Sequence, residues 1–212
     1  MDGFGRMSFL EGGLMLDAAR LAAALPRWCA GVHAAAPELN ALDGRLGDAD
    51  LGATLDKCAS QVHAALPELP DSLEGIFRRC AQASAKASGS SFGTLLTVAL
   101  MTCAKRCAGV DSLSRADLAA LLAEVVSALA ARGGANLGDK TVLDGLHAVA
   151  TALASSPDDA DARRVASAAS RAALDDFRDK PNRSGRARMF ADKTIGLDDP
   201  GMVALQRMVD SL

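Results

Sequence analysis

Three aspartates fall within eight residues of one another in the run Asp43-Gly-Arg-Leu-Gly-Asp48-Ala-Asp50-Leu-Gly52. Closely spaced carboxylates repel one another unless a cation lies between them, and Mg²⁺ and Ca²⁺ prefer such oxygen ligands. The spacing is not that of a calcium-binding loop, and the run contains no histidine or cysteine of the kind that binds zinc. The triplet therefore favours magnesium held by carboxylates together with phosphates. A solvated acidic turn that caps a helix through Asp50 explains the same spacing equally well.

Two runs of small residues each precede an apolar segment with helical spacing: Ala87-Ser88-Gly89-Ser90-Ser91-Phe92-Gly93-Thr94 and Gly133-Gly134-Ala135-Asn136-Leu137-Gly138-Asp139-Lys140-Thr141. Free backbone N–H groups and the positive end of a helix dipole can bind phosphate at such a place. The first run is not a Walker A loop, because it lacks the glycine and lysine spacing of that motif. Each run also has a simpler interpretation. The first is then a turn with an N-cap, and the second a helix connection capped by Asp139 or Thr141.

A long basic segment, residues 177–199, precedes the last predicted helix. Between Arg178 and Lys193 it holds six basic and two acidic residues, so this stretch has a net charge of +4 while the rest of the chain has −7. Long connections in compact domains are more often functional than short ones, and the planar fork of an arginine such as Arg186 matches phosphate oxygens. Taken alone, the same run is typical of a solvated charged surface.

The composition predicts the elements that must position these residues. Apolar residues make up 50% of the 212 residues, aromatic residues only 3%, and alanine and leucine recur throughout, which favours helices over strands. Apolar residues with helical spacing predict eight helices, over residues 14–36, 53–66, 73–87, 92–108, 115–132, 141–155, 159–179 and 202–212. Pro26 is expected to kink or split the first of them. We therefore expect one all-α domain covering residues 1–212, since no connection is long enough for an interdomain linker.

Charge and cysteine content limit the partners and the location. The formal net charge of −3 provides no basic field for nucleic acid. Five scattered cysteines without a C-x-x-C pair indicate reduced thiols and a cytoplasmic protein. The first residues, Met1 to Leu16, lack the apolar region of a signal peptide, and no apolar stretch is long enough to cross a membrane.

Four motifs in this order resemble the nucleotide-binding subunit of dihydroxyacetone kinases, the DhaL family. The resemblance covers nearly the whole chain, and four motifs in register are far more specific than any one of them. They are Leu42-Asp43 with Gly47-Asp48-Ala49-Asp50 and Gly52; Ala87-Ser88-Gly89 with Phe92-Gly93-Thr94; Arg132-Gly133 with Gly138-Asp139-Lys140-Thr141 and Asp144; and Gly185-Arg186-Ala187 with Ile195-Gly196 and Asp199-Pro200-Gly201.

This resemblance implies a barrel of eight antiparallel helices with ADP or ATP bound in the loops at one end. It implies that Asp43, Asp48 and Asp50 hold two Mg²⁺ ions, and that Arg186 stabilises the charge of the transferred phosphoryl group. It further implies nucleotide contacts from Leu51, Gly52, Thr54, Ala87, Ser88, Gly89, Gly133, Thr141, Val142, Arg186, Asp199, Pro200 and Gly201. Leu51 differs from the histidine that the family commonly has there, and Ala85-Lys86 replaces a glycine pair.

The resemblance also implies the partners. The substrate, dihydroxyacetone or a related short hydroxyketone, would be bound by a separate DhaK-type subunit. The phosphoryl donor would be either exchangeable ATP or bound ADP that a DhaM-type protein rephosphorylates in place. No nucleic acid or membrane is expected as a partner, and a homodimer stays open. The alternatives are a kinase subunit for another ketose and a regulatory nucleotide-binding module without turnover.

Overall fold

The computed structural model describes residues 15–87, 89–157 and 160–212. Within these ranges the chain forms eight α-helices, which are α1 (Ala18–Leu46), α2 (Leu51–Ala65), α3 (Leu73–Ala87), α4 (Ser91–Arg106), α5 (Arg115–Gly133), α6 (Val142–Ser155), α7 (Ala162–Arg178) and α8 (Pro200–Asp210). Two 3₁₀ segments, η1 (Leu66–Glu68) and η2 (Ala187–Thr194), lie between helices. The expected all-α class is confirmed.

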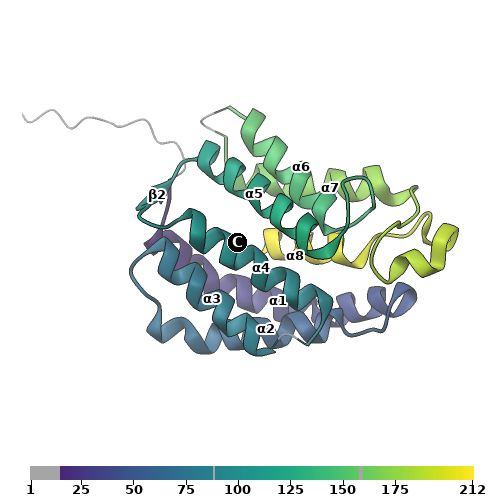
Figure 1. The fold of residues 1–212 in the computed structure, drawn as a ribbon, viewed down its shortest axis with the longest axis horizontal. Helices are drawn as coiled ribbons and strands as arrows, with labels where there is room; N and C mark the ends of the chain where they lie inside the picture. The colour runs from purple at the N-terminus through teal and green to yellow at the C-terminus, as the bar shows by residue number, and fades with distance from the viewer. Residues whose placement is uncertain (1–14, 88, 158–159) are drawn as a thin grey trace, which may run out of the picture.

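The helices form a closed up-and-down ring (Figure 1). Each helix packs against the next one in the chain, and α8 returns to pack against α1 as well as α7. Short connections force consecutive helices to run antiparallel. Alternate connections therefore lie at the same end of the ring, and these are the α1–α2, α3–α4, α5–α6 and α7–α8 connections. The four sequence motifs lie on these four connections.

Small residues allow the helices to approach closely around a leucine-rich core. Leu39, Leu55 and Leu121 are buried, as are Ala59 and Ala204, on helices spread around the ring. Leucine and alanine are strong helix formers, so the residues that favour the helices are also the residues that fill the core.

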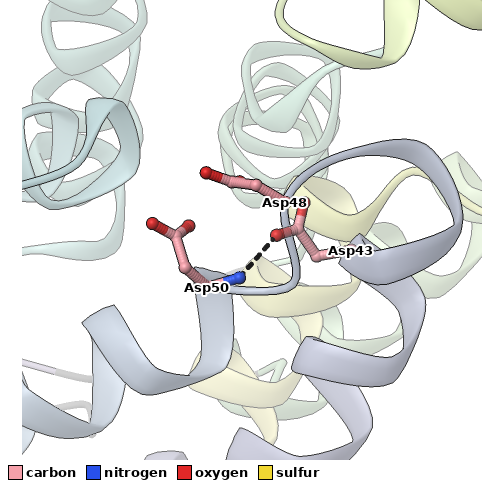
Figure 2. Close-up of side chains that lie close together, drawn as sticks. All are labelled: Asp43, Asp48 and Asp50. Atoms are coloured by element: carbon pink, nitrogen blue, oxygen red, sulfur yellow. Dashed lines mark hydrogen bonds between the residues drawn. The ribbon is translucent and has the colours of Figure 1, made fainter.

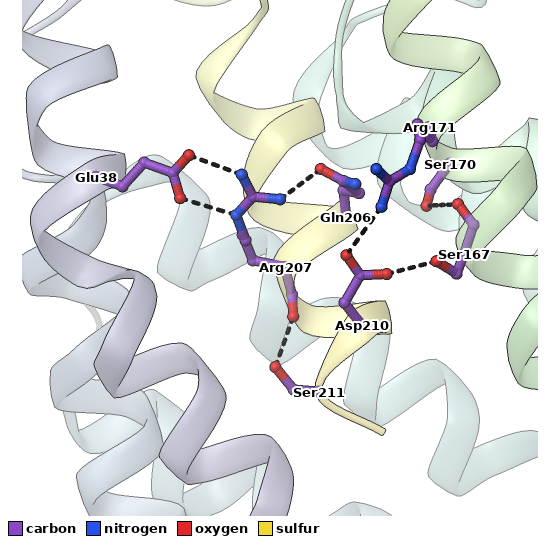
Figure 3. A network of polar contacts seen from close by, with 8 residues as sticks. All are labelled: Glu38, Ser167, Ser170, Arg171, Gln206, Arg207, Asp210 and Ser211. Atoms are coloured by element: carbon purple, nitrogen blue, oxygen red, sulfur yellow. Dashed lines mark hydrogen bonds and ion pairs between the residues drawn. The ribbon is translucent and has the colours of Figure 1, made fainter.

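A polar network closes the ring on the outside, where α8 lies between α1 and α7 (Figure 3). The guanidinium of Arg207 donates to both carboxylate oxygens of Glu38 on α1, at 2.8 and 2.7 Å. On the other side of α8, Asp210 accepts a hydrogen bond from Ser167 at 2.6 Å and pairs with Arg171 at 3.7 Å. The Arg207 guanidinium lowers the pKa of Glu38. Helix α8 is thus joined to both of its neighbours by ion pairs.

The first helix differs from its prediction. The apolar spacing predicts an end at Ala36, but α1 continues to Leu46 with Pro26 and Pro37 inside it. Of the two outcomes predicted at Pro26, a kink or a split, the split does not occur, because one helix runs through this residue. Leu39 and Leu46 are buried on the same helix, and this burial outweighs the loss of a backbone hydrogen bond at each proline.

Smaller differences occur elsewhere. A two-residue strand β1 (Leu16–Asp17) pairs antiparallel with β2 (Ser112–Leu113), which the apolar spacing does not predict. The predicted helix starts at Leu14 and Asp159 fall outside the described residues. Residues 1–14, where the sequence predicts no signal peptide, fall outside them as well. Among the described residues, no helix is both long and apolar enough to cross a membrane.

Candidate functional site

One cavity of about 700 Å³ lies at the end of the ring where the four motif connections meet. Its walls include most of the residues that the sequence singles out. These are Asp43, Asp48, Asp50, Leu51, Gly89, Gly133, Thr141, Val142, Arg186, Asp199, Pro200 and Gly201. Residues up to 158 positions apart in the sequence thus line one cavity. The resemblance predicts this, because it places all four motifs at one end of the barrel.

The three aspartates form a compact cluster on one wall (Figure 2). One carboxylate oxygen of each residue lies within 4.8 Å of the others. Asp43 lies in the last turn of α1, not in a loop as predicted, because α1 extends to Leu46. Asp48 and Asp50 follow in the short connection to α2, where Ala49 adopts a positive φ of 60°. The left-handed turn at Ala49 allows the chain to reverse within four residues and brings the two loop aspartates back toward Asp43.

The helix-cap interpretation of Asp50 does not hold. Asp50 occupies the N-cap position of α2, but its side chain makes no capping hydrogen bond. Asp43 Oδ2 instead accepts from the backbone N–H groups of Asp50 and Leu51, at 3.0 and 3.3 Å. The carboxylate of Asp50 is thereby left to face the cavity. Three carboxylates with no nitrogen or sulfur donor in the cluster are a suitable donor set for Mg²⁺.

Arg186 contacts this cluster from the basic segment of residues 177–199. Its guanidinium forms an ion pair with Asp48, although the two residues are far apart in the sequence and both side chains are about half exposed. The basic segment and the acidic connection are therefore joined across the mouth of the cavity. A guanidinium next to three carboxylates can compensate negative charge that a ligand brings into the site.

Four helices, α2, α4, α6 and α8, begin at the cavity, and the last three have side-chain N-caps. Ser90 caps α4 by accepting from Gly93 N at 3.2 Å, and Thr141 caps α6 in a reciprocal capping box with Asp144. Asp199 caps α8 by accepting from Met202 N at 2.9 Å. The N-cap interpretation of both small-residue runs is thus confirmed. Four positive helix ends around one cavity also favour an anionic ligand. Phosphate binding itself stays a prediction.

Apart from Val142, which the resemblance gives as a nucleotide contact, the apolar part of the cavity was not among the predicted contacts. Phe92 and Leu95 from α4, Leu129 from α5, and Val142 and Leu143 from α6 line it. Leu95, Leu129 and Leu143 have the spacing of ordinary core positions on their helices, so no signal separates them from the core. The cavity therefore has an acidic wall and an apolar wall, as a ligand with a charged end and a planar apolar end requires.

Four predicted contacts lie away from the cavity walls or outside the described residues. Gly52 and Thr54 are buried in α2, and Ala87 ends α3; none of the three lines the cavity. Ser88 lies outside the described residues. A Cβ at Gly52 would overlap the backbone carbonyl of Ala36 on α1. Gly52 therefore has a packing role that its position in the motif did not reveal.

Substituting Gly52 by alanine tests this packing role. The added methyl group must push α1 and α2 apart, since its nearest neighbour is backbone. We expect Gly52→Ala to lower the free energy of unfolding by about 2 kcal/mol, as overpacking does. Urea unfolding measures the change, and Gly89→Ala is the matched control because nothing lies within 4 Å of its added Cβ. Equal stability of the two variants would contradict the close approach of the helices.

Asp199 is a buried carboxylate with several polar partners. Its Oδ2 accepts from Asn182 Nδ2 at 2.8 Å, while its Oδ1 caps α8. Burial raises the pKa of Asp199 to about 6, although these hydrogen bonds and the nearby charge of Lys140 oppose the rise. In the folded protein Asp199 therefore keeps its proton to a higher pH than in the unfolded chain.

This raised pKa predicts how stability changes with pH. Between pH 3.8, its ordinary value, and about 6, the folded ligand-free protein binds more protons at Asp199 than the unfolded chain does. Raising the pH through this range must lower the free energy of unfolding. We expect the stability of the unmodified protein to fall relative to that of Asp199→Asn between these two pH values, and the difference to level off above them. Parallel profiles in urea unfolding would show that the carboxylate ionises at its ordinary pKa.

Comparisons with known proteins agree with this architecture. Residues 45–212 match the family model described as the DAK2 domain. L-erythrulose 1-kinase of Mycolicibacterium smegmatis is 29% identical over 133 residues, which are 62% of this chain and 23% of that protein. Two crystal structures of the dihydroxyacetone kinase of C. freundii, one in complex with AMP-PNP and Mg²⁺ and one in the native form, superpose with a TM-score of 0.73.

These relatives are much longer than the chain. The C. freundii structures match all of this chain at 22% identity, but only 36% and 37% of their own chains are covered. At this identity the superposition shows the shared barrel fold, whereas the family model matches most of the chain. The chain belongs to the DAK2 domain family.

Proposed function

We propose that residues 1–212 form one nucleotide-binding domain of a kinase that phosphorylates a short hydroxyketone. One observation carries the proposal: a single cavity combines the cluster of three aspartates, Arg186, four helix N-termini and an apolar wall. One of the C. freundii structures is a complex with AMP-PNP and Mg²⁺, which supports nucleotide and magnesium as the ligands of this cavity. The regulatory alternative shares this binding but lacks the transfer.

The aspartate cluster is the proposed metal site. Asp43, Asp48 and Asp50 would hold the magnesium, which supplies charge neutralisation for the nucleotide phosphates. Asp43 also keeps the connection in shape, because one of its oxygens accepts from two backbone N–H groups. Arg186 would exchange its contact with Asp48 for the phosphates. In this proposal the chain positions the phosphoryl group and compensates its charge, and provides no covalent intermediate.

The apolar wall is the proposed site of the nucleotide base. Phe92 from α4 and Val142 from α6 contribute to that wall, and Gly133, the last residue of α5, also lines the cavity. The turn at Gly89 and the start of α6 at Thr141 would then face the sugar and the phosphates. Such a division explains why one cavity has both an apolar and a charged wall.

In this proposal a partner holds the ketone. Among the described residues that line the cavity there is no histidine, cysteine or lysine, so the cavity has no nitrogen or sulfur nucleophile for a covalent adduct with a ketone. We assign that role to a DhaK-type substrate-binding subunit or domain. The length of the relatives supports this division, since the chain spans 23% of the erythrulose kinase. The donor is ATP, or ADP rephosphorylated in place by a DhaM-type protein.

The transfer forms a phosphate ester on a primary hydroxyl group of the ketone. The bond from the transferred phosphorus to its donor oxygen breaks, and the hydroxyl group loses its proton. Dihydroxyacetone and L-erythrulose both present such a hydroxyl beside a carbonyl. The M. smegmatis relative is an L-erythrulose kinase, which supports the four-carbon ketose as a candidate beside dihydroxyacetone.

The test reconstitutes the reaction from its parts. The purified chain is mixed with a DhaK-type protein, Mg²⁺, ATP and each of the two ketones, and phosphorylated ketone is measured by mass spectrometry. Product that requires both proteins supports the kinase. A second reaction with phosphorylated DhaM-type protein and ADP distinguishes the two donors. Nucleotide binding without product from either donor would contradict the kinase and leave the regulatory module.

A further inference from the structure

Lys140 is a buried lysine that joins the two ends of the segment carrying Arg186. It is 1% exposed, and its ammonium nitrogen donates to three backbone carbonyls. The acceptors are Arg178 O at 3.0 Å, Lys180 O at 2.7 Å and Thr194 O at 2.9 Å. The first two lie where α7 ends, and the third lies at the end of η2. The intervening residues 181–193, including Arg186, thus form a loop that this ammonium group closes at its base.

Burial of an ammonium ion is costly, so the contacts must compensate for it. All three N–H donors of Lys140 are used, and two of the acceptors are carbonyls near the C-terminus of α7, where a helix lacks internal donors and favours a cation. Burial lowers the pKa of Lys140, and the charges of Asp199, Asp198 and Asp179 oppose that change. The lysine has no contact with the cavity, because it is not among the residues that line it.

Asn182 adds a second connection at the same place. Its side-chain Nδ2 donates to Lys140 O and to Asp199 Oδ2, both at 2.8 Å, and its backbone N–H donates to Thr194 Oγ1 at 2.8 Å. The next residue, Arg183, donates its backbone N–H to Asp139 O at 2.9 Å. The loop is therefore fixed to the start of α6 and to the start of α8 only three residues before Arg186.

We propose that Lys140 is a positioning residue that fixes this loop so that Arg186 reaches the acidic wall of the cavity. Arg186 is about half exposed and follows Gly185, which has a positive φ of 66°. A long side chain on an unanchored loop would lose conformational entropy each time it bound a phosphate. Because the base of the loop is already fixed in the folded protein, part of this conformational entropy is lost on folding and not on phosphate binding. The inference rests on the proposed function of the cavity, in which Arg186 contacts the phosphates.

The first test needs no ligand. Amide hydrogen exchange is measured on the unmodified protein and on Lys140→Met, which keeps the side-chain bulk but removes all three donors. We expect at least tenfold faster exchange at Asn182, Arg183 and Gly196, whose amides donate within this base, as for a locally opened segment. Exchange in α2 and α3 should not change. Lys193→Met is the matched control, because Lys193 is an exposed lysine of the same loop. Unchanged exchange at the three amides would overturn the proposal.

The second test asks whether Lys140 acts through Arg186. In the reconstituted reaction, Lys140→Met should lower the transfer rate by about tenfold, as expected when hydrogen bonds from a charged donor are lost. In an Arg186→Met background the same change should have almost no further effect, because the residue that it positions is absent. Equal losses in both backgrounds would indicate a general structural role and contradict the proposal.

Asn182→Ala keeps the tests decisive if Lys140→Met does not fold. It removes the amide that joins Lys140 O to Asp199, but leaves the buried ammonium in place. The same faster exchange and the same dependence on Arg186 are expected. If the unmodified protein binds no nucleotide, the proposed function fails, whereas the exchange experiment still decides whether Lys140 closes the loop.

Discussion

Replacing Asp48 and Asp50 together by asparagine is expected to lower the affinity for magnesium and ADP by about 100-fold or more, because two anionic ligands of the cation are lost. The two carboxylates lie in the same cluster with Asp43, with one oxygen of each within 4.8 Å of the others. Asparagine retains the size of the side chain but no negative charge. Calorimetric titration with ADP in the presence and absence of Mg²⁺ measures the loss.

The fold should survive this double change. Neither side chain makes a hydrogen bond within α2, since Asp43 and not Asp50 accepts from the first N–H groups of that helix. Asp56→Asn is the matched control, because Asp56 also lies on α2 but pairs with His33 away from the cavity. Retained magnesium-dependent binding in the double variant would show that the metal is held elsewhere.

Substitution of Arg186 by methionine is expected to reduce transfer far more than binding. The guanidinium lies beside Asp48 at the mouth of the cavity, where it can compensate charge that develops on the transferred phosphoryl group. Removing such an arginine costs about a thousandfold in rate in other phosphoryl-transfer enzymes. We expect a loss of that order in the reconstituted reaction, with a smaller change in the affinity for magnesium and ADP.

The control for Arg186→Met is the arginine two positions further along. Arg188 is exposed on the same loop and does not line the cavity, so Arg188→Met should retain the rate. Similar losses in the two variants would attribute the effect to the overall charge of the loop. A full rate in Arg186→Met would exclude the guanidinium from the transfer.

Most of the fold could be predicted from the spacing of apolar residues. Eight segments with helical spacing correspond to the eight α-helices of the described residues, because leucine and alanine recur on one face of each. The first helix was predicted from apolar spacing to end at Ala36, but α1 continues through Pro37 to Leu46. The buried leucines Leu39 and Leu46 extend the helix through packing that no local rule contains.

The candidate site could be predicted in part. The polar residues Asp43, Asp48, Asp50 and Arg186 carry signals of charge and spacing, and the structure brings all four to one cavity. Whether they bind metal and nucleotide stays a prediction. In the apolar wall, Leu95, Leu129 and Leu143 had no such signal, since a cavity residue and a core residue on the same helix face have the same spacing.

The anchor of the arginine loop could not be predicted from spacing either. Lys140 is followed by a helix cap, and a lysine at such a position is usually solvated. Its burial depends on carbonyl groups that lie 38 to 54 residues further along the chain. Only the folded ring brings these groups together, so the sequence alone contains no signal for the interaction.

The most direct measurement is a calorimetric titration of the unmodified protein with ADP and ATP, with and without Mg²⁺, after any nucleotide that copurifies has been identified by mass spectrometry and removed. We predict one nucleotide bound per chain, with an affinity that falls sharply when EDTA removes the magnesium. Copurified ADP in stoichiometric amount would favour a nucleotide that is recharged in place. Binding that is equally tight without magnesium, or no binding of either nucleotide, would contradict the assignment of the aspartate cluster and its cavity.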